Sequence, residues 1–183
     1  MSLAAPYLQR SLADPRIAWA YERLRSDPSA ARAIEEGRLH DLYEIARVRL
    51  RTLADPAERE ALGYLLAWRR NFLMPMSEAD RKRFLPFVTQ FHGRTEEDPS
   101  DGSNIQALCY VGFAYLPIWP IGQYVIRHAG GGSSLMSTRY EIFGKVPLAD
   151  FWRIWRIAVL VALPVGALLL AVFVWLVGSR AHP

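Results

Sequence analysis

Apolar side chains in the first ninety residues recur at the spacing of amphipathic helices. One run is Leu42, Ile45, Ala46, Val48, Leu50 and Leu53, and a second is Leu62, Leu65, Leu66, Trp68 and Phe72. Asp-Pro pairs precede helix-forming sequence at 14–15, 27–28 and 55–56. Asp caps a helix N-terminus and Pro fits the first helical position, where no N–H partner is needed. The pattern predicts helices over 15–25, 29–52 and 56–73, with a break in the second at Gly37.

A fourth helix is predicted after residue 76. Ser77 is its expected N-cap, and Asp80 stands where it completes a capping box. Its apolar side would be formed by Phe84, Phe87, Val88 and Phe91. Gly93 would end the helix, and Pro86 inside it predicts a kink or an earlier end. Residues 1–93 are therefore expected to form a helical head domain, a small bundle of four or five helices.

The next segment, 94–104, is polar, acidic and rich in turn-forming residues, which predicts a linker or an exposed loop. It also separates two compositions. Residues 1–104 carry equal numbers of basic and acidic side chains, whereas 105–183 carry six basic and two acidic ones and are much more apolar.

The strongest hydrophobic signal is an uncharged run of 21 residues from Ile157 to Val177, of which fourteen are Leu, Ile, Val or Phe. A helix of this length reaches about 30 Å, which matches the hydrocarbon core of a bilayer. We therefore expect a juxtamembrane and transmembrane helix over 151–178, followed by a short tail over 179–183. Pro164 lies inside this segment, and membrane helices tolerate such a residue.

Residues at both ends of this run suit the membrane interface. Tryptophan rings prefer the headgroup layer, and arginine side chains reach lipid phosphate. The candidate membrane-interface residues are Trp152, Arg153, Trp155 and Arg156 at one end and Trp175 at the other. The bilayer, and anionic lipid headgroups in particular, is thus an expected partner.

Residues 105–150 form a second apolar segment that is harder to interpret. Residues 105–126 are uncharged and long enough to be a second span, but they contain Pro117, Pro120 and several aromatic and β-branched residues. The stretches 123–127 and 138–143 alternate as strands do, which predicts a β-hairpin. We expect the hairpin and a single span, and a pair of spans with the first over 105–126 is the alternative.

The distribution of basic residues favours the single span. Arg127, Arg139, Lys145, Arg153 and Arg156 lie between the two apolar segments, and Arg180 lies beyond the second. The positive-inside rule places the stretch 127–156 in the cytoplasm. The N-terminal residues do not resemble a signal peptide, so we expect the head in the cytoplasm too. Arginine outnumbers lysine 20 to 2, as in GC-rich bacterial genomes, which suggests a bacterial inner membrane.

Candidate chemistry is sparse along the chain. Glu36, His40 and Glu44 have the spacing of one helix face and could bind a divalent metal, but a solvated polar face explains them better. Cys109 is the only cysteine, so no internal disulfide is expected, and its apolar setting favours an inert thiol. The glycine-rich run 130–134 lacks the ending of a phosphate-binding loop. Basic residues in a neutral head do not predict nucleic-acid binding.

The sequence thus predicts a mainly α fold: a helical-bundle head, an apolar membrane-proximal segment with a β-hairpin, and one C-terminal transmembrane helix. We expect no catalytic, cofactor or metal site. The expected function is that of a non-enzymatic, C-terminally anchored membrane protein, an adaptor or accessory subunit that binds a protein partner in a membrane complex. The alternative is a two-span subunit of a transport or lipid-handling assembly.

Overall fold

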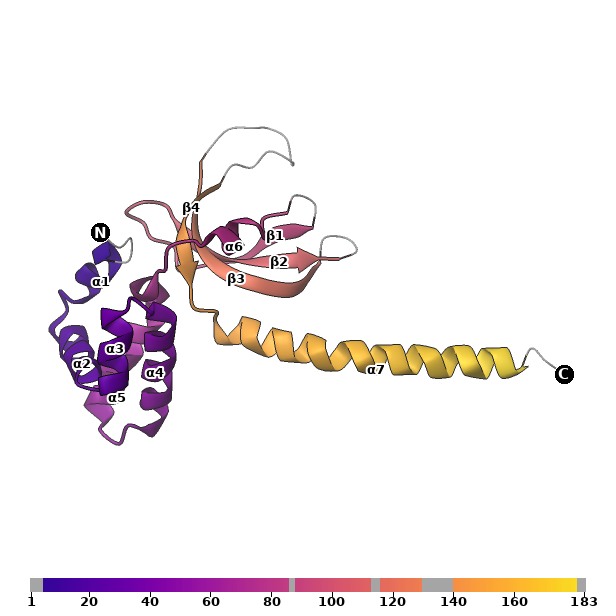
Figure 1. The fold of residues 1–183 in the computed structure, drawn as a ribbon, viewed down its shortest axis with the longest axis horizontal. Coiled ribbons are helices and arrows are strands. Elements are labelled where there is room, and N and C mark those ends of the chain that lie inside the picture. The colour runs from indigo at the N-terminus through magenta and orange to yellow at the C-terminus, as the bar shows by residue number, and fades with distance from the viewer. Residues whose placement is uncertain (1–4, 86–87, 113–115, 130–139, 181–183) are drawn as a thin grey trace.

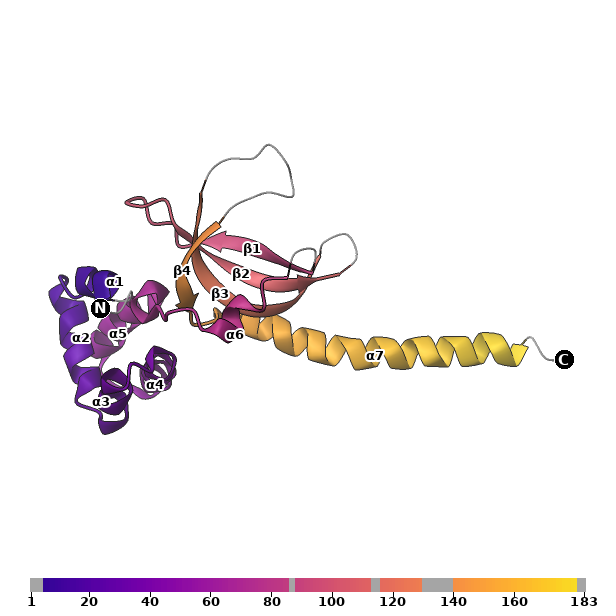
Figure 2. The same ribbon diagram turned by 45° about the horizontal axis from the view of Figure 1, so that its top comes forward.

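A computed structural model describes residues 5–85, 88–112, 116–129 and 140–180 of the chain. Among these residues 55% are helical and 23% lie in a four-stranded antiparallel sheet. The fold is mixed α/β, so the prediction of a mainly α fold is wrong. Figures 1 and 2 show a bundle of helices, a sheet beside it and a long C-terminal helix that projects away from both.

The helical part follows the sequence pattern from residue 15 onward, but α1 lies outside the predicted helices and the helix predicted over 56–73 ends at Ala67. Its helices are α1 (Ala5–Ser11), α2 (Pro15–Arg25), α3 (Pro28–Glu35), α4 (Leu39–Thr52) and α5 (Pro56–Ala67). Asp14, Asp27 and Asp55 accept hydrogen bonds from the first backbone N–H groups of α2, α3 and α5, so the predicted caps are confirmed. Gly37, with φ of 66°, lies at the break between α3 and α4. The apolar faces close on Leu24, Leu42, Leu62, Leu65 and Phe72, which are buried.

The fourth predicted helix is wrong beyond its first turn. After the 3₁₀ helix η1 (Arg69–Phe72), Ser77 and Asp80 form the expected capping box, but α6 covers only Glu78–Arg81. The chain then enters β1 (Thr89–Thr95). Phe91 pairs with Leu108 across the sheet and its ring contacts other aromatic side chains. Tertiary pairing satisfies the backbone and partly buries this phenylalanine, which outweighs the helical spacing.

The sheet is a meander in which each strand pairs with the next along the chain. Its strands are β1, β2 (Asn104–Val111), β3 (Pro117–His128) and β4 (Tyr140–Val146). Side chains of β2 alternate between two covered faces. Leu108 packs on one face with Tyr124 and Ile126, whereas Ala107 and Cys109 pack on the other against the C-terminal helix.

The segment 105–126, the alternative second span, lies in the sheet over 105–111 and 117–126, whereas 113–115 fall outside the described residues. Its residues pair from Ile105 opposite Val125 to Val111 opposite Pro117. The expected pairing of 123–127 with the strand after it is present, since Arg127 lies opposite Glu141. The β3–β4 pair lies at one edge of the four-stranded sheet and is not a separate hairpin. The acidic segment 94–104 completes β1 and connects it to β2.

Helix α7 (Asp150–Arg180) is the long C-terminal helix of Figure 1. It runs through Pro164 without interruption. In the described part of the chain, α7 alone is long and apolar enough to cross a membrane, and its most apolar stretch is not buried inside the protein. This stretch exposes Leu160, Leu163, Leu168, Leu169 and Phe173.

Candidate functional site: the base of helix α7

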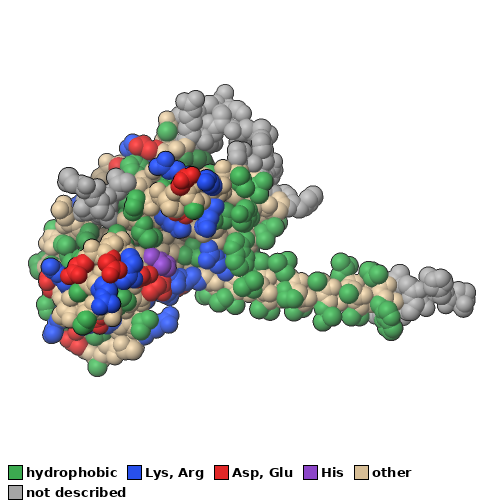
Figure 3. Space-filling model, viewed as in Figure 1, with side chains coloured by type: hydrophobic (Ala, Val, Ile, Leu, Met, Phe, Trp, Pro, Cys, Tyr) green, Lys and Arg blue, Asp and Glu red, His purple; other side chains and the backbone are tan. Residues whose placement is uncertain are grey.

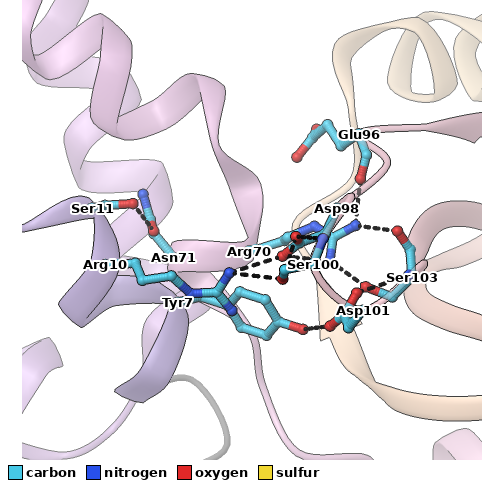
Figure 4. A network of polar contacts seen from close by, with 10 residues as sticks. All are labelled: Tyr7, Arg10, Ser11, Arg70, Asn71, Glu96, Asp98, Ser100, Asp101 and Ser103. Atoms are coloured by element: carbon cyan, nitrogen blue, oxygen red, sulfur yellow. Dashed lines mark hydrogen bonds and ion pairs between the residues drawn. The ribbon is translucent and has the colours of Figure 1, made fainter.

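The base of α7, Asp150–Arg156, is joined to a head whose own two parts are fixed to each other. Arg70, on η1, is fully buried between the helices and the β1–β2 connection. It donates hydrogen bonds to the Ser103 hydroxyl at 2.5 Å, to the Ser103 carbonyl at 2.9 Å and to the Glu96 carbonyl. Its guanidinium also lies 3.9 Å from the Asp98 carboxylate. Figure 4 shows how these groups converge from the two parts.

Residues of α1 extend the Arg70 network. Arg10 donates hydrogen bonds to Asp98 and Ser100, each at 3.2 Å, and the Tyr7 hydroxyl donates to Asp101 at 3.1 Å. Asp98 is buried, and burial raises the pKa of its carboxyl group. The hydrogen bonds from Ser100 and the positive charges of Arg10 and Arg70 outweigh burial and hold that pKa below its usual value. The connection between β1 and β2 is thus held against the helical part, with the Asp98 carboxylate ionised and accepting a hydrogen bond from Arg10.

The neighbouring Arg69 connects this network to the start of α7. Its Nε donates to the Glu96 carboxylate at 2.6 Å, and its guanidinium also bonds the Gln123 side chain and the Pro147 carbonyl. The Gln123 oxygen accepts a further bond from the Ala149 N–H at 2.7 Å. The direction in which α7 leaves the head is therefore set by buried hydrogen bonds just before the helix begins.

The Trp152 side chain packs the first turn of α7 against the sheet. Its side chain is buried with Ala107 and Cys109 of β2. A Cβ atom added to Gly93 would lie 3.2 Å from the Trp152 ring. Gly93 also has φ of 67°, a conformation that other residues rarely adopt. The glycine thus provides both the backbone conformation and the space that the indole occupies.

Polar contacts complete the base of α7. Arg153 pairs with Glu44 of α4 and donates to the Leu148 carbonyl at 2.8 Å. Arg156 donates to the Pro120 carbonyl at 2.8 Å and lies over the Trp119 ring. The Trp155 Nε1–H donates to the Ile118 carbonyl at 2.9 Å. We call these contacts, together with Trp152, the joint.

Within the joint, the candidate membrane-interface residues of the base contact protein groups of the same chain. Trp152 is buried in protein and exposes little surface to lipid, and Arg153 and Arg156 bond to groups of the same chain. Trp155 combines its hydrogen bond with 36% exposure, and Trp175 is 69% exposed near the far end of α7. The structure brings the first four residues together at one place and leaves Trp175 far from them along the helix (Figure 1).

A pocket of about 400 Å³ opens beside the joint, between Met74, Gly122, Lys145 and Arg156. Its most buried charge is Asp80, which accepts hydrogen bonds from Lys145 and Ser77 at 2.8 and 2.7 Å. Burial raises the pKa of Asp80, but these two partners outweigh it and hold the pKa below its usual value. Both charges of the Asp80–Lys145 pair are thus engaged within the chain.

The other candidate residues are not brought together. Gly37 separates Glu36, which accepts from Arg38 at 2.6 Å, from Glu44, which pairs with Arg153. Over residues 5–85, 88–112, 116–129 and 140–180, no cluster of three or more His, Cys, Asp or Glu is placed to hold a metal ion. Burial raises the pKa of the Cys109 thiol to about 12, which leaves it protonated at neutral pH. The glycine-rich run 130–134 lies outside the described residues.

Sequence reasoning missed the buried arginines of η1. Arg69 and Arg70 resemble a surface pair after an amphipathic helix, and the acidic stretch that binds them lies about thirty residues later. The available signal was compositional: two arginines next to an apolar helix, and several acids in a turn-rich segment. The two arginines meet this acidic segment only in the folded sheet, so the contact could not be predicted without the order of the strands.

Comparison of the chain with protein-family models, with curated protein sequences and with solved structures found no match.

Proposed function

We propose that this chain is a C-terminally anchored integral membrane protein that acts as a non-enzymatic adaptor or accessory subunit of a membrane protein complex. Its head would lie at the cytoplasmic face of a bacterial inner membrane. The observation that carries the proposal is α7, whose most apolar stretch is left uncovered by the described part of the chain. An exposed apolar surface of this length requires a lipid or protein environment.

The joint supports an adaptor role over a simple tether. A flexible linker would let the head take any orientation above the bilayer. Here α7 is continuous with a base that is fixed by a buried indole and by hydrogen bonds to β3 and α4. The anchor would therefore present the head at one height and one angle, as a subunit of an assembly requires.

A surface suited to a protein partner lies on the helical part, away from α7 (Figures 1 and 2). Trp19 and Tyr64 are 39% and 48% exposed and line a hollow of about 200 Å³ between α2 and α5. Arg23 lies over the Trp19 ring and Arg16 over the Tyr64 ring. Tryptophan, tyrosine and arginine are the residues most enriched at binding hot spots.

Cysteine-accessibility labelling tests the topology. Single cysteines at Glu35, Ser133 and His182 would be labelled in intact cells and after permeabilisation, with Cys109 of the parent chain as the background control. We expect Glu35 and Ser133 to be labelled from the cytoplasmic side and His182 from the opposite side, because of the basic residues between 127 and 156. Labelling of Glu35 and Ser133 from opposite sides would contradict the single span.

Photocrosslinking tests the partner surface. A photoreactive residue at Tyr64 is expected to crosslink one membrane protein in cells, and the same residue at the exposed Arg51 serves as the control. The adaptor role predicts a crosslink that disappears in a Trp19→Ala background. Equal crosslinking at the two positions, or none at Tyr64, would contradict it.

A further inference from the structure

The end of the sheet nearest α7 exposes a group of apolar side chains, which we call the apolar rim. Its members are Leu85, Val88, Tyr110, Leu116 and Ile118, between 39% and 64% exposed. Backbone hydrogen bonds hold them at one end of the sheet: Val111 N–H donates to the Val88 carbonyl at 3.0 Å, and Gly112 N–H to the Leu116 carbonyl at 3.0 Å. The rim is a fixed surface formed from three neighbouring chain segments.

The joint fixes the depth of the rim relative to the uncharged part of α7. The Trp155 side chain bonds the Ile118 carbonyl, so Ile118 lies beside the last turn of the base. The start of β3, which Leu116 precedes in the chain, lies on the side toward which α7 leaves the head (Figures 1 and 2). Two strand residues span about 7 Å, which is about four or five residues of helix. Leu116 is thus level with residues just beyond Ile157, where the uncharged run begins.

The charges around the rim have the arrangement of an interfacial surface. Residues 105–126 carry no charge, whereas Arg81, Lys82 and Arg83 lie just before Leu85 in the chain, separated from it by Phe84. In Figure 3 hydrophobic side chains continue from the end of the sheet onto α7, and charged side chains gather toward the helical part. Apolar residues bordered by basic ones suit the boundary between acyl chains and headgroups.

We infer that the apolar rim inserts into the headgroup and upper acyl region of the same leaflet that α7 enters. The inference rests on the membrane anchor proposed above. The occupant is lipid because the rim lies level with the uncharged part of α7, so lipid that surrounds the helix also meets the rim. The head is thereby attached at two places, the helix and the sheet, which together restrict its tilt.

Depth-dependent fluorescence quenching tests the inference with the full chain in phosphatidylcholine–phosphatidylglycerol vesicles. Each variant carries one introduced cysteine for a bimane label, at Leu116, Val88, Val165 or Val48. Cys109 is retained in every variant, because its thiol is buried and protonated. Val48 is an exposed valine on α4 and is the matched control for Val88. Phosphatidylcholine with a nitroxide high on its acyl chain is the quencher.

We expect quenching at Leu116 and Val88 at least twofold above that at Val48, and strong quenching at Val165. Quenching at Val165 with Leu116 and Val88 no different from Val48 would overturn the rim and leave the anchor standing. Weak quenching at all four positions would overturn the anchor itself. Labels at the rim that are shielded from aqueous iodide, yet not quenched by the lipid, would show a protein occupant and also overturn the inference.

Discussion

Arg70 donates three of the hydrogen bonds that join the helical part of the head to the sheet part. A fully buried guanidinium is costly to desolvate unless its donors are satisfied. Here the Ser103 and Glu96 carbonyls, the Ser103 hydroxyl and the Asp98 carboxylate surround its two terminal nitrogens, whereas its buried Nε has no hydrogen-bond partner among the described residues. These partners have a fork geometry that arginine satisfies and lysine does not.

Replacing Arg70 should therefore destabilise the head strongly. We expect Arg70→Ala to cost about 3–5 kcal/mol, because it leaves the buried Asp98 charge without this partner. The midpoint of thermal unfolding in mild detergent, followed by circular dichroism, should fall by about 10 °C. Arg70→Lys should recover little of this loss. Arg51→Ala, on the exposed end of α4, is the control and should change the midpoint by a degree or two; an equal effect of both alanine variants would argue against the network.

Acid should weaken the same contact. The pKa of Asp98 is held below its usual value, and so are the pKa values of Asp80, Asp101 and Glu44. A carboxyl whose pKa is lower in the folded state stabilises that state above its unfolded pKa, and this stabilisation is lost as pH falls through the folded value. Thermal unfolding midpoints should therefore drop as pH falls below about 4. Asp98→Asn should make the dependence shallower, whereas an unchanged slope would show that Asp98 does not contribute.

At the scale of elements, the joint determines how α7 meets the head. The run Trp152-Arg153-Ile154-Trp155-Arg156 suits a lipid interface by composition. In the fold, its tryptophans and arginines reach the sheet and α4. Their contribution to membrane orientation would then act through the head as well as through lipid.

Removing both arginines of the joint should loosen the head without releasing the anchor. We expect Arg153→Ala with Arg156→Ala to stay membrane-bound, because the uncharged run is unchanged. The distance distribution between spin labels at Glu35 and Val165, measured by pulsed electron paramagnetic resonance in nanodiscs, should broaden. The control is Arg127→Ala, which removes an exposed ion pair with Glu141. An unchanged distribution in the double variant would mean that these arginines do not orient the head.

For the whole molecule, the proposed anchor α7 and the proposed insertion of the apolar rim together predict how the chain binds a membrane. Among the described segments, α7 alone has the length and apolar composition to cross a bilayer. A chain that ends at Arg156 keeps the joint and loses the span. We expect this truncated chain to be released from membranes by alkaline carbonate, and to retain partial binding to anionic vesicles at neutral pH through the rim. Resistance to carbonate, as measured by sedimentation, would mean that a second segment spans the membrane.

Sequence by itself determined the local features, because each depends on a few neighbouring residues. Asp14, Asp27 and Asp55 cap helices through adjacent N–H groups, and Gly37 breaks a helix through its own backbone freedom. The apolar length of α7 is likewise a property of one continuous segment.

Tertiary structure decided the rest, and β2 shows why. Both of its faces are covered, so its sequence is uncharged and mostly apolar, and by composition it resembles part of a membrane span. Phe91 joined a strand rather than a helix because its partners, Leu108 and Tyr124, come from later in the chain. Trp152 meets Gly93, and Arg70 meets Ser103, across more than thirty residues of sequence. Contacts of this kind depend on strand order, which local periodicity does not encode.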